Sequence, residues 1–451
     1  MKHAAFLCLT LLLLPCVLAA QAPPAALARP REPIAVATEF LDLLAKGDYQ
    51  AATRGFAEPM KAAAPPEKLA EIWTALQSQF GVFKRRVSAR LEKQGPYDIV
   101  LAATEFERST VNLKVALDGD GRIGGFFIDP PAAAPAAEYV PPAYVRKDAF
   151  RERDVTVGAG DWAVPGTLTV PVGQGPFPAV VLVHGSGPND RDETVEASKP
   201  FRDLAWGLAS RGIAVLRYDK RTRQHGAKLA SVASFTVQEE TVDDALAAAA
   251  LLRGTEGIDP RRVYVLGHSL GAMLVPRIGQ RDDQIAGFVV MAGAAKPLED
   301  LILEQVTYIA GLDGAVSDQE KKQLEGLRQE VVRVKALEPG ATGSVLGAPV
   351  SYWLDLKGYH PAEAAKAIAR PMLILQGDRD YQVTPDNLEA WKKALAGRAN
   401  VTFKSYPGLN HLFIEGEGKS GPADYQKPGH VAEAVVADVA GWIGGPAAAK
   451  P

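Results

Sequence analysis

The spacing of apolar residues changes near the middle of the chain and predicts two kinds of domain. In the first part, apolar residues recur at helical spacing over residues 34–46 and 67–80. They then alternate with polar residues along four short segments, 83–91, 99–103, 111–117 and 123–128. The pattern predicts two or three helices followed by an antiparallel sheet, which is a small α+β domain over residues 33–129.

In the second part, apolar residues form short continuous runs instead of alternating. The runs cover residues 179–183, 214–216, 263–266, 288–291 and 372–376. Continuous hydrophobicity is typical of strands that are buried on both faces of a parallel sheet. Helical patterns lie between and after these runs, at 201–211, 237–253, 270–279 and 431–443. We therefore expect an α/β domain over about residues 148–445.

Residues 130–147 separate the two predicted domains and are rich in proline and alanine. Repeated prolines prevent a continuous helix, and the alanines offer little surface to bury. We interpret this segment as an interdomain linker.

The first twenty residues have the pattern of a secretory signal peptide. Lys2 and His3 precede the apolar run 4–14, Pro15 ends the run, and small residues follow at Ala19 and Ala20. The run is shorter than the roughly 18 residues of a membrane span, and no later stretch approaches that length. We expect an exported protein, periplasmic or extracellular, with no membrane span after the signal is removed.

Both cysteines of the chain, Cys8 and Cys16, lie inside this signal. The mature chain would then have no thiol, no disulfide and no cysteine metal ligand. A lipoprotein anchor on Cys16 is the alternative interpretation. Pro15 argues against it, because lipidated signals carry a small residue at that position.

Composition and charge exclude a disordered chain and a nucleic-acid-binding protein. The chain has 451 residues, of which 47% are hydrophobic and 23% are charged, so it can bury two cores and is not disordered. Lys and Arg number 50 and Asp and Glu number 53, for a net charge of −3. No basic stretch is long enough to bind nucleic acid by neutralising phosphates, so we expect neither DNA nor RNA as a partner.

The strongest chemical signal is the pattern Gly-x-Ser-x-Gly around Ser269. A buried strand is predicted to end at Leu266, and a helix-compatible segment begins at Leu270. A strand, a sharp turn and a helix place a serine hydroxyl at the carboxyl edge of a sheet. Gly267 and Gly271 suit that turn because side chains there would collide with neighbouring backbone. We therefore predict that Ser269 is a nucleophile.

A serine nucleophile of this kind needs backbone N–H groups that bind the oxygen of the tetrahedral intermediate. The segment His184-Gly-Ser-Gly-Pro188 follows another buried strand. We predict an oxyanion hole made of the Leu270 N–H and an N–H from Ser186 or Gly187. His184 is expected to be structural, and the charged stretch 189–193 is expected to be a solvated loop rather than one that faces substrate.

The serine also needs a base, and the base needs a carboxylate that orients it. Among seven histidines, His411 stands apart, because it lies in a loop directly after the strand-like run 401–406. Asp378 and Asp380 both follow the predicted strand 372–376. A Ser, Asp, His order along the chain is the order of the α/β-hydrolase fold.

Residues 295–368 exceed what a minimal domain of this type needs and are predicted to form a helical lid. Ser317 and Glu320 have the spacing of a capping box, and apolar residues follow at helical spacing up to Val334. Tyr352 and Trp353, near the end of this segment, could line a substrate pocket. Packing of the lid on the main domain explains them equally well.

At this point the chain resembles the α/β-hydrolase superfamily, specifically bacterial dienelactone-hydrolase-like and lysophospholipase-like serine esterases. The motifs that carry the resemblance are HGSGP at 184–188, RYDKR at 217–221, GHSLG at 267–271, LQGDRDYQVT at 375–384 and LNHLF at 409–413. The resemblance implies hydrolysis of carboxylic esters with no metal and no organic cofactor. It also favours Asp380 over Asp378, because related enzymes place the acid three residues after the glycine.

The N-terminal pattern, helices followed by a curved antiparallel sheet, looks like the cone-shaped nuclear-transport-factor or SnoaL-like fold. The resemblance covers residues 33–129 and implies an accessory domain. No reactive cluster is present in it, so accessory packing or substrate presentation is the expected role.

Together these features predict an exported serine esterase that forms an acyl-enzyme on Ser269, with His411 as base and Asp380 as orienting acid. A serine peptidase or aminopeptidase, or an acyltransferase, would use the same residues. A binding protein that has lost activity is the alternative outside the enzymes. Dehalogenases and epoxide hydrolases need an aspartate where Ser269 stands.

Overall fold

The computed structural model describes residues 32–94, 97–107, 110–129, 139–229, 232 and 234–445. The contacts between residues divide the chain into two compact units, and the boundary lies between Glu138 and Tyr139. The predicted signal peptide, and residues 130–138 of the predicted linker, lie outside the described residues.

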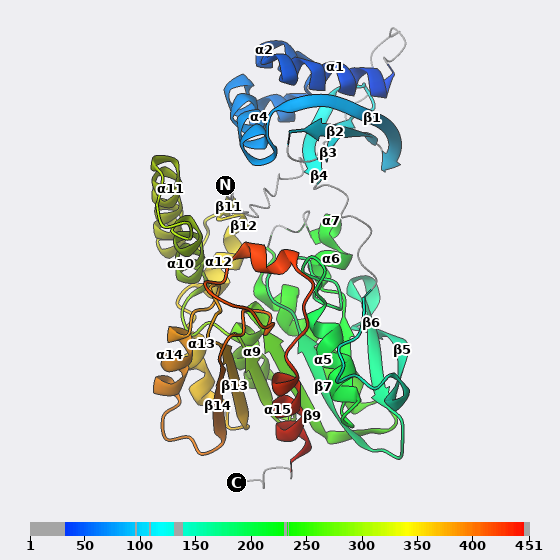
Figure 1. Cartoon of the computed structure of the whole chain (residues 1–451), viewed down its shortest axis with the longest axis vertical. Helices are drawn as coiled ribbons and strands as arrows, with labels where there is room; N and C mark the ends of the chain where they lie inside the picture. The colour runs from blue at the N-terminus through cyan, green and yellow to red at the C-terminus, as the bar shows by residue number, and fades with distance from the viewer. Residues whose placement is uncertain are drawn as a thin grey trace. The chain divides into compact units, whose positions relative to one another are not determined.

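The N-terminal unit consists of helices and one four-stranded antiparallel sheet with the order β1-β2-β3-β4 (Figure 1). Its elements are α1 (Pro33–Lys46), α2 (Tyr49–Ala52), η1 (Thr53–Gly55), α3 (Glu58–Ala63), α4 (Pro66–Phe80), β1 (Phe83–Gln94), β2 (Tyr97–Phe106), β3 (Thr110–Leu117) and β4 (Ile123–Asp129). Apolar side chains of α1 and α4 pack on one face of the sheet, where Phe40 meets Phe126 and Trp73 meets Phe106. The unit therefore has a hydrophobic core of its own.

One detail of β1 differs from the regular alternation that its sequence predicts. Register shifts lie between Phe83 and Arg85 and between Arg86 and Ser88. Each shift inserts an extra residue and changes which side chains point inward. As a result Ala89 packs toward the core, whereas Val87 is 50% exposed.

The C-terminal unit is built around an eight-stranded sheet with the order β14-β13-β10-β9-β7-β8-β6-β5. Its strands are β5 (Phe150–Val157), β6 (Val164–Pro171), β7 (Phe177–Val183), β8 (Ala214–Tyr218), β9 (Ile258–His268), β10 (Phe288–Met291), β13 (Met372–Gly377) and β14 (Val401–Tyr406). The six strands from β14 to β8 pair in parallel, and β6 pairs antiparallel with both β8 and β5. This arrangement is the predicted α/β-hydrolase fold.

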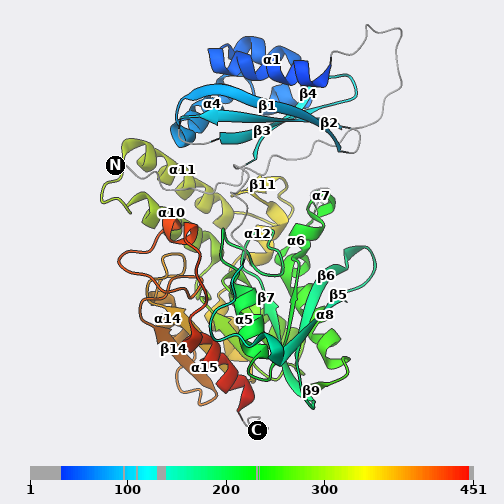
Figure 2. The ribbon, with the colours of Figure 1, turned by 45° about the vertical axis from the view of Figure 1, so that its right-hand side comes forward.

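Helices cover both faces of this sheet (Figures 1 and 2). They are α5 (Pro200–Ala209), α8 (Asp243–Arg253), α9 (Leu270–Arg281), α14 (Asp386–Ala394) and α15 (Glu433–Gly444). The connections between elements contain the short helices α6 (Arg221–Gln224) and α7 (Gly226–Leu229) and the short turns η2 (Lys147–Ala149), η3 (Gly160–Trp162), η4 (Gln238–Val242) and η6 (Pro422–Gln426). Alternate side chains of β7 point to opposite faces of the sheet. Val180 and Leu182 pack with α5 and α15 on one face. Val181 and Val183 pack with α8 and α9 on the other. Burial on both faces explains the continuous apolar runs in the sequence.

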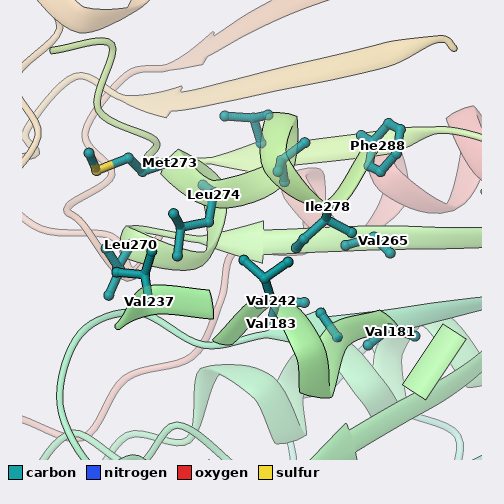
Figure 3. Close-up of a cluster of buried hydrophobic side chains, with 14 of the residues drawn as sticks. Val181, Val183, Val237, Val242, Val265, Leu270, Met273, Leu274, Ile278 and Phe288 are labelled. Carbon is teal, nitrogen blue, oxygen red and sulfur yellow. The ribbon is translucent and has the colours of Figure 1, made fainter. Parts of the chain in front are cut away.

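Helix α9 begins directly after Ser269, so its packing fixes the position of that residue. Its side chains Leu270, Met273, Leu274 and Ile278 are buried against apolar residues of β7, β9 and the η4 region (Figure 3). The start of α9 is therefore held by the core rather than by the surface of the domain.

A helical insertion occupies the predicted lid segment. It contains α10 (Leu298–Ala310), α11 (Asp318–Lys335), β11 (Ser344–Val345), β12 (Ala348–Pro349), α12 (Val350–Leu356), α13 (Pro361–Ala364) and η5 (Ala365–Ala367). Helices α10 and α11 pack against each other. The capping box is present, since Ser317 accepts a hydrogen bond from the Glu320 N–H and Glu320 accepts one from the Ser317 N–H.

Candidate active site

The candidate site lies at the carboxyl edge of the parallel sheet. Strands β7, β9, β10, β13 and β14 end side by side at this edge. The loops that carry the predicted residues leave from the ends of β7, β9, β13 and β14. The carboxyl ends of parallel strands are where ligand sites form in open α/β sheets.

Ser269 occupies the sharp turn between β9 and α9. Its φ of 53° lies in the left-handed region, which non-glycine residues rarely adopt and which marks a strained turn. The two glycines of the motif make the turn possible. A Cβ on Gly267 would lie 2.4 Å from the Gly271 carbonyl, and one on Gly271 would lie 2.3 Å from the Val183 carbonyl oxygen. The Ser269 N–H donates to Met291 O at 3.0 Å, which ties the turn to β10.

Asp380 and His411 are joined directly, and both are buried. His411 Nδ1 donates to Asp380 Oδ2 at 2.7 Å. The other carboxylate oxygen, Oδ1, accepts the N–H groups of Gln382 and Val383 at 2.8 and 2.9 Å. Because all these partners are fixed, the carboxylate can hold the imidazole in one orientation and one tautomer, with Nε2 free of the proton.

A glycine allows the histidine loop to approach the acid. A Cβ on Gly377, at the end of β13, would lie 2.4 Å from Leu409 O and 2.8 Å from Asn410 O. The loop is then shaped by Asn410, whose Oδ1 accepts the N–H groups of Leu412 and Ile414. This close approach places His411 beside the end of β13.

His268, the residue before Ser269, links the serine turn to the histidine loop. Its Nε2 donates to the carbonyl oxygen of His411 at 3.0 Å, and the two imidazole centroids are 4.7 Å apart. Among the described residues, the Ser269 hydroxyl makes no hydrogen bond to His411. In unliganded enzymes this bond is often long and shortens only with substrate, so the link between serine and base remains a prediction.

A buried histidine and a buried glutamate lie close together next to the turn of Ser269. His268 Nδ1 is 3.0 Å from Glu193 Oε2, and both side chains are about 5% exposed or less. Burial alone would lower the pKa of His268, but the Glu193 carboxylate and the His411 carbonyl together raise it above its usual value. Burial opposes ionisation of Glu193 too, and His268, His184 and the Gly185 N–H outweigh it and lower the pKa of Glu193.

Glu193 also binds the backbone of the predicted oxyanion loop. Glu193 Oε1 accepts the Gly185 N–H at 2.6 Å. A Cβ on Gly185 would lie 3.1 Å from Ser269 Cβ, so this loop borders the serine. Within the described ranges, the N–H groups of Ser186 and Gly187 donate to no protein acceptor, and both residues are exposed. Leu270, the first residue of α9, has no acceptor within its helix for its N–H.

The interpretation of residues 189–193 as a solvated loop is wrong. Asp192 and Glu193 are buried, and Asp192 pairs with Arg202 at 2.6 Å and with the buried Arg217. Arg191 is bound to Asp219. The charges of the loop are therefore internal ion pairs, a possibility that neighbouring charges along a sequence do not reveal.

Tyr352 and Trp353, considered as pocket residues, are buried in the hydrophobic core. The Tyr352 hydroxyl donates to Glu240 Oε2 at 2.8 Å, and the Trp353 indole N–H donates to Val345 O at 2.7 Å. Both polar atoms have internal partners, which favours the packing alternative for these two residues.

Aromatic residues that the sequence analysis did not single out flank the Asp380–His411 pair. Tyr381 follows the acid and stacks on Tyr308 of α10, with ring centroids 5.4 Å apart, and Tyr425 lies at 6.2 Å. Leu412, which follows the histidine, belongs to the same apolar cluster. The insertion thus contributes apolar surface beside the site. Tyr381 was detectable by its place next to the predicted acid, whereas Tyr308 was not.

A second histidine also contacts a buried aspartate. His430 Nδ1 lies 3.1 Å from Asp203 Oδ1, and Asp203 accepts the Tyr139 hydroxyl at 2.5 Å and the Val431 N–H at 2.9 Å. These contacts join α5 to the loop before α15. None of these partners belongs to the turn of Ser269.

Among the described residues, no group of three or more His, Cys, Asp or Glu side chains is arranged to hold a metal ion. No helix in those ranges combines the length and the apolar composition needed to cross a membrane.

Comparison with protein families finds two matching regions. Residues 174–418, more than half of the chain, match the family described as serine aminopeptidase, S33. Residues 37–126 match a family described as a protein of unknown function, DUF3887. The two regions fall in the two compact units.

Comparison with individual proteins finds similarity over nearly the whole chain. Esterase EstD of Thermotoga maritima is 40% identical over 404 residues, which is 90% of this chain and 93% of that protein. A monoacylglycerol lipase of Mycolicibacterium smegmatis is 25% identical over 250 residues, 54% of this chain and 85% of the lipase. Among solved structures, the esterase domain of a Rhodothermus marinus protein matches with a TM-score of 0.39 and 17% identity, over 65% of this chain and 99% of that one. The chain belongs to the serine aminopeptidase S33 family of α/β-hydrolases and is a homologue of esterase EstD.

Proposed function

We propose that this chain is a serine hydrolase that cleaves carboxylic esters through an acyl-enzyme on Ser269. The observation that carries the proposal is the 2.7 Å hydrogen bond from His411 to Asp380, at the sheet edge where the strained turn holds Ser269. The ester class is supported by the similarity to EstD along 90% of this chain.

Acylation begins when His411 Nε2 takes the proton of the Ser269 hydroxyl. Ser269 Oγ forms a bond to the ester carbonyl carbon, and the carbonyl π electrons move to its oxygen. Asp380 stabilises the imidazolium that results. His411 then gives the proton to the alcohol oxygen as the C–O bond breaks, and the alcohol leaves.

Deacylation repeats these steps with water. His411 takes a proton from water, the hydroxide oxygen attacks the acyl carbon, and Ser269 Oγ recovers the proton as the acid is released. In both half-reactions the negative oxygen is bound by the N–H of Leu270 and the N–H of Ser186 or Gly187. One such donor is worth on the order of 100- to 1,000-fold in kcat.

Amide hydrolysis is the second candidate, and the family description, serine aminopeptidase, is the observation that favours it. The same three side chains would serve an amide. Rates on a series of p-nitrophenyl esters of increasing acyl length, measured beside aminoacyl anilides, separate the two substrate classes.

The test of the serine mechanism is the Ser269→Ala variant, assayed with p-nitrophenyl acetate. If the three side chains act as a unit, kcat falls by about 10⁶. The His411→Ala variant should lose a similar amount. His430→Ala is the matched control, because His430 also contacts a buried aspartate, and it should retain activity. Turnover by Ser269→Ala close to that of the native chain would refute the proposal.

We further propose that the chain is exported, on the basis of the signal pattern in residues 1–20. N-terminal sequencing of the protein recovered from the periplasm or medium should begin near residue 21. An intact N-terminus on protein found only in the cytoplasm would contradict export.

A further inference from the structure

The motif RYDKR, residues 217–221, has no role in the mechanism above, yet its lysine reaches the oxyanion loop. Lys220 follows the end of β8 and is 1% exposed. Its Nζ donates to the carbonyl oxygen of Gly185 at 2.8 Å. A buried lysine is costly unless it is paired, so its position calls for a physical reason.

The reason lies in the peptide group that Lys220 contacts. The Gly185 carbonyl and the Ser186 N–H belong to one planar peptide unit, and in a trans peptide they point in opposite directions. A cation that fixes the carbonyl therefore fixes the direction of the Ser186 N–H. It also polarises the peptide, which makes that N–H a stronger donor.

Both peptide groups of Gly185 have internal hydrogen-bond partners. The N–H of Gly185 donates to Glu193, and Asn189 Nδ2 donates to the Gly185 carbonyl at 3.2 Å. Both sides of Gly185 are thus bound internally, whereas the Ser186 N–H has no acceptor in the described part of the chain. The Gly187 N–H has no acceptor there either. Of these two groups that could meet a substrate oxygen, the Ser186 N–H is the one whose direction Lys220 fixes.

Lys220 is itself positioned by a second buried group. Its Nζ lies 2.9 Å from Glu240 Oε1, and Glu240 is 6% exposed. Glu240 stands in η4, a π-helical turn at the start of α8, and such turns are frequent at functional sites. The other oxygen of Glu240 accepts the hydroxyl of Tyr352, from α12 of the insertion.

We propose that Lys220 is a positioning residue for the oxyanion hole, and that Glu240 and Tyr352 connect it to helix α12 of the insertion. The inference rests on the proposed function, because it concerns the N–H that would bind the oxyanion. It assigns Tyr352 a role through Lys220 rather than in a substrate pocket. A displacement of α12 would therefore reach the oxyanion loop through four buried groups in series. These are the Tyr352 hydroxyl, the Glu240 carboxylate, the Lys220 Nζ and the Gly185 carbonyl.

The test uses two variants of the full chain. Lys220→Met/Glu240→Gln removes the cation and also the unpaired carboxylate that Lys220→Met alone would leave. Tyr352→Phe removes one hydroxyl. Each is assayed with p-nitrophenyl acetate and with an alkyl trifluoromethyl ketone, which forms a tetrahedral adduct on a serine nucleophile and so needs the oxyanion hole.

We expect the double variant to lose about 10- to 100-fold in kcat, with KM changed by less than about twofold. Inhibition by the trifluoromethyl ketone should weaken in parallel with kcat/KM. Tyr352→Phe should show smaller losses in the same direction. Asp244→Asn is the matched control: it breaks the buried pair of Asp244 with Arg221, the neighbour of Lys220, and should leave kcat and inhibition unchanged.

An unchanged affinity for the ketone in the folded double variant would overturn the inference. If that variant does not fold, an unchanged affinity in Tyr352→Phe would do the same, and circular dichroism and thermal unfolding identify which case applies. Failure of the proposed function looks different, because Ser269→Ala would then remain active and the ketone would not inhibit the native chain.

Discussion

His411 Nδ1 and Asp380 Oδ2 lie 2.7 Å apart, whereas the carboxylate of Asp378 is exposed and accepts the N–H of Gly408. The two aspartates stand only two residues apart in the chain, and one of them alone contacts the imidazole. The distinction gives a direct comparison between two isosteric substitutions.

Asp380→Asn should lower kcat by about 10⁴, because an amide in place of the carboxylate favours the wrong tautomer of His411 and no longer stabilises its cation. Asp378→Asn should change kcat by less than about twofold. Steady-state kinetics with p-nitrophenyl acetate measure both values. Equal losses in the two variants would contradict the assigned roles.

Gly377→Ala should have a larger effect on kcat than on the free energy of unfolding. The added Cβ would meet Leu409 O and Asn410 O at under 3 Å, so the loop that carries His411 has to move away from Asp380. A displacement of about 1 Å near the reacting groups can cost 100-fold in rate. Gly441→Ala in α15 meets nothing within 4 Å and should retain native kcat. Native kcat in Gly377→Ala would show that this contact is not needed.

Glu193→Gln should destabilise the fold in a pH-dependent way. Removing one partner of a buried pair costs about 3–5 kcal/mol, and the amide still offers an acceptor to the Gly185 N–H. Because Glu193 raises the pKa of His268, its contribution to the free energy of unfolding is present below about pH 6.5 and is lost as the pH rises through the folded pKa.

The lowered pKa of Glu193 sets the lower end of the pH range in which the pair stabilises the fold. Its contribution is present above about pH 4.5 and is lost as the pH falls through the folded pKa. Denaturant unfolding at a series of pH values should therefore show the largest difference between native and Glu193→Gln near pH 5.5, and a smaller one near pH 9. Glu196→Gln, in the same loop but exposed, is the control. A difference that grows with pH would contradict the pairing.

Ser317→Ala should loosen helix α11 of the insertion without affecting the main domain. Loss of the cap costs about 1 kcal/mol, which would appear as faster amide hydrogen exchange in α11 and unchanged exchange in α9. Ser317→Asp keeps a capping oxygen and should restore protection. Unaltered exchange in Ser317→Ala would show that the insertion, rather than the cap, holds this helix.

Much of the fold could be predicted because both faces of the central sheet are buried. Strands β7, β8, β9, β10 and β13 contain continuous apolar runs, and all five were predicted from the sequence. β5 and β6 were not predicted. β5 lies at the edge of the sheet, and its exposed positions carry charged residues, which removes the continuous apolar signal. β6 is largely buried, but Pro, Gly and Thr interrupt its apolar residues.

The candidate site was predictable where a residue follows the end of a predicted strand. Ser269, Asp380 and His411 each follow such an end. Glu193, Lys220 and Glu240 were not predicted, because their roles depend on contacts between distant segments, such as the 2.8 Å bond from Lys220 to Gly185. Charged residues are usually solvated, so burial of these three can be recognised only from the packing.

The serine mechanism is tested most directly by identifying the residue that becomes covalently modified. The full chain would be treated with a fluorophosphonate, digested and mapped by mass spectrometry. A nucleophile at Ser269 predicts a single adduct on the peptide that contains this residue, and its absence in Ser269→Ala. Folded, active protein with no adduct at Ser269, or with an adduct on another serine, would show that Ser269 is not the nucleophile.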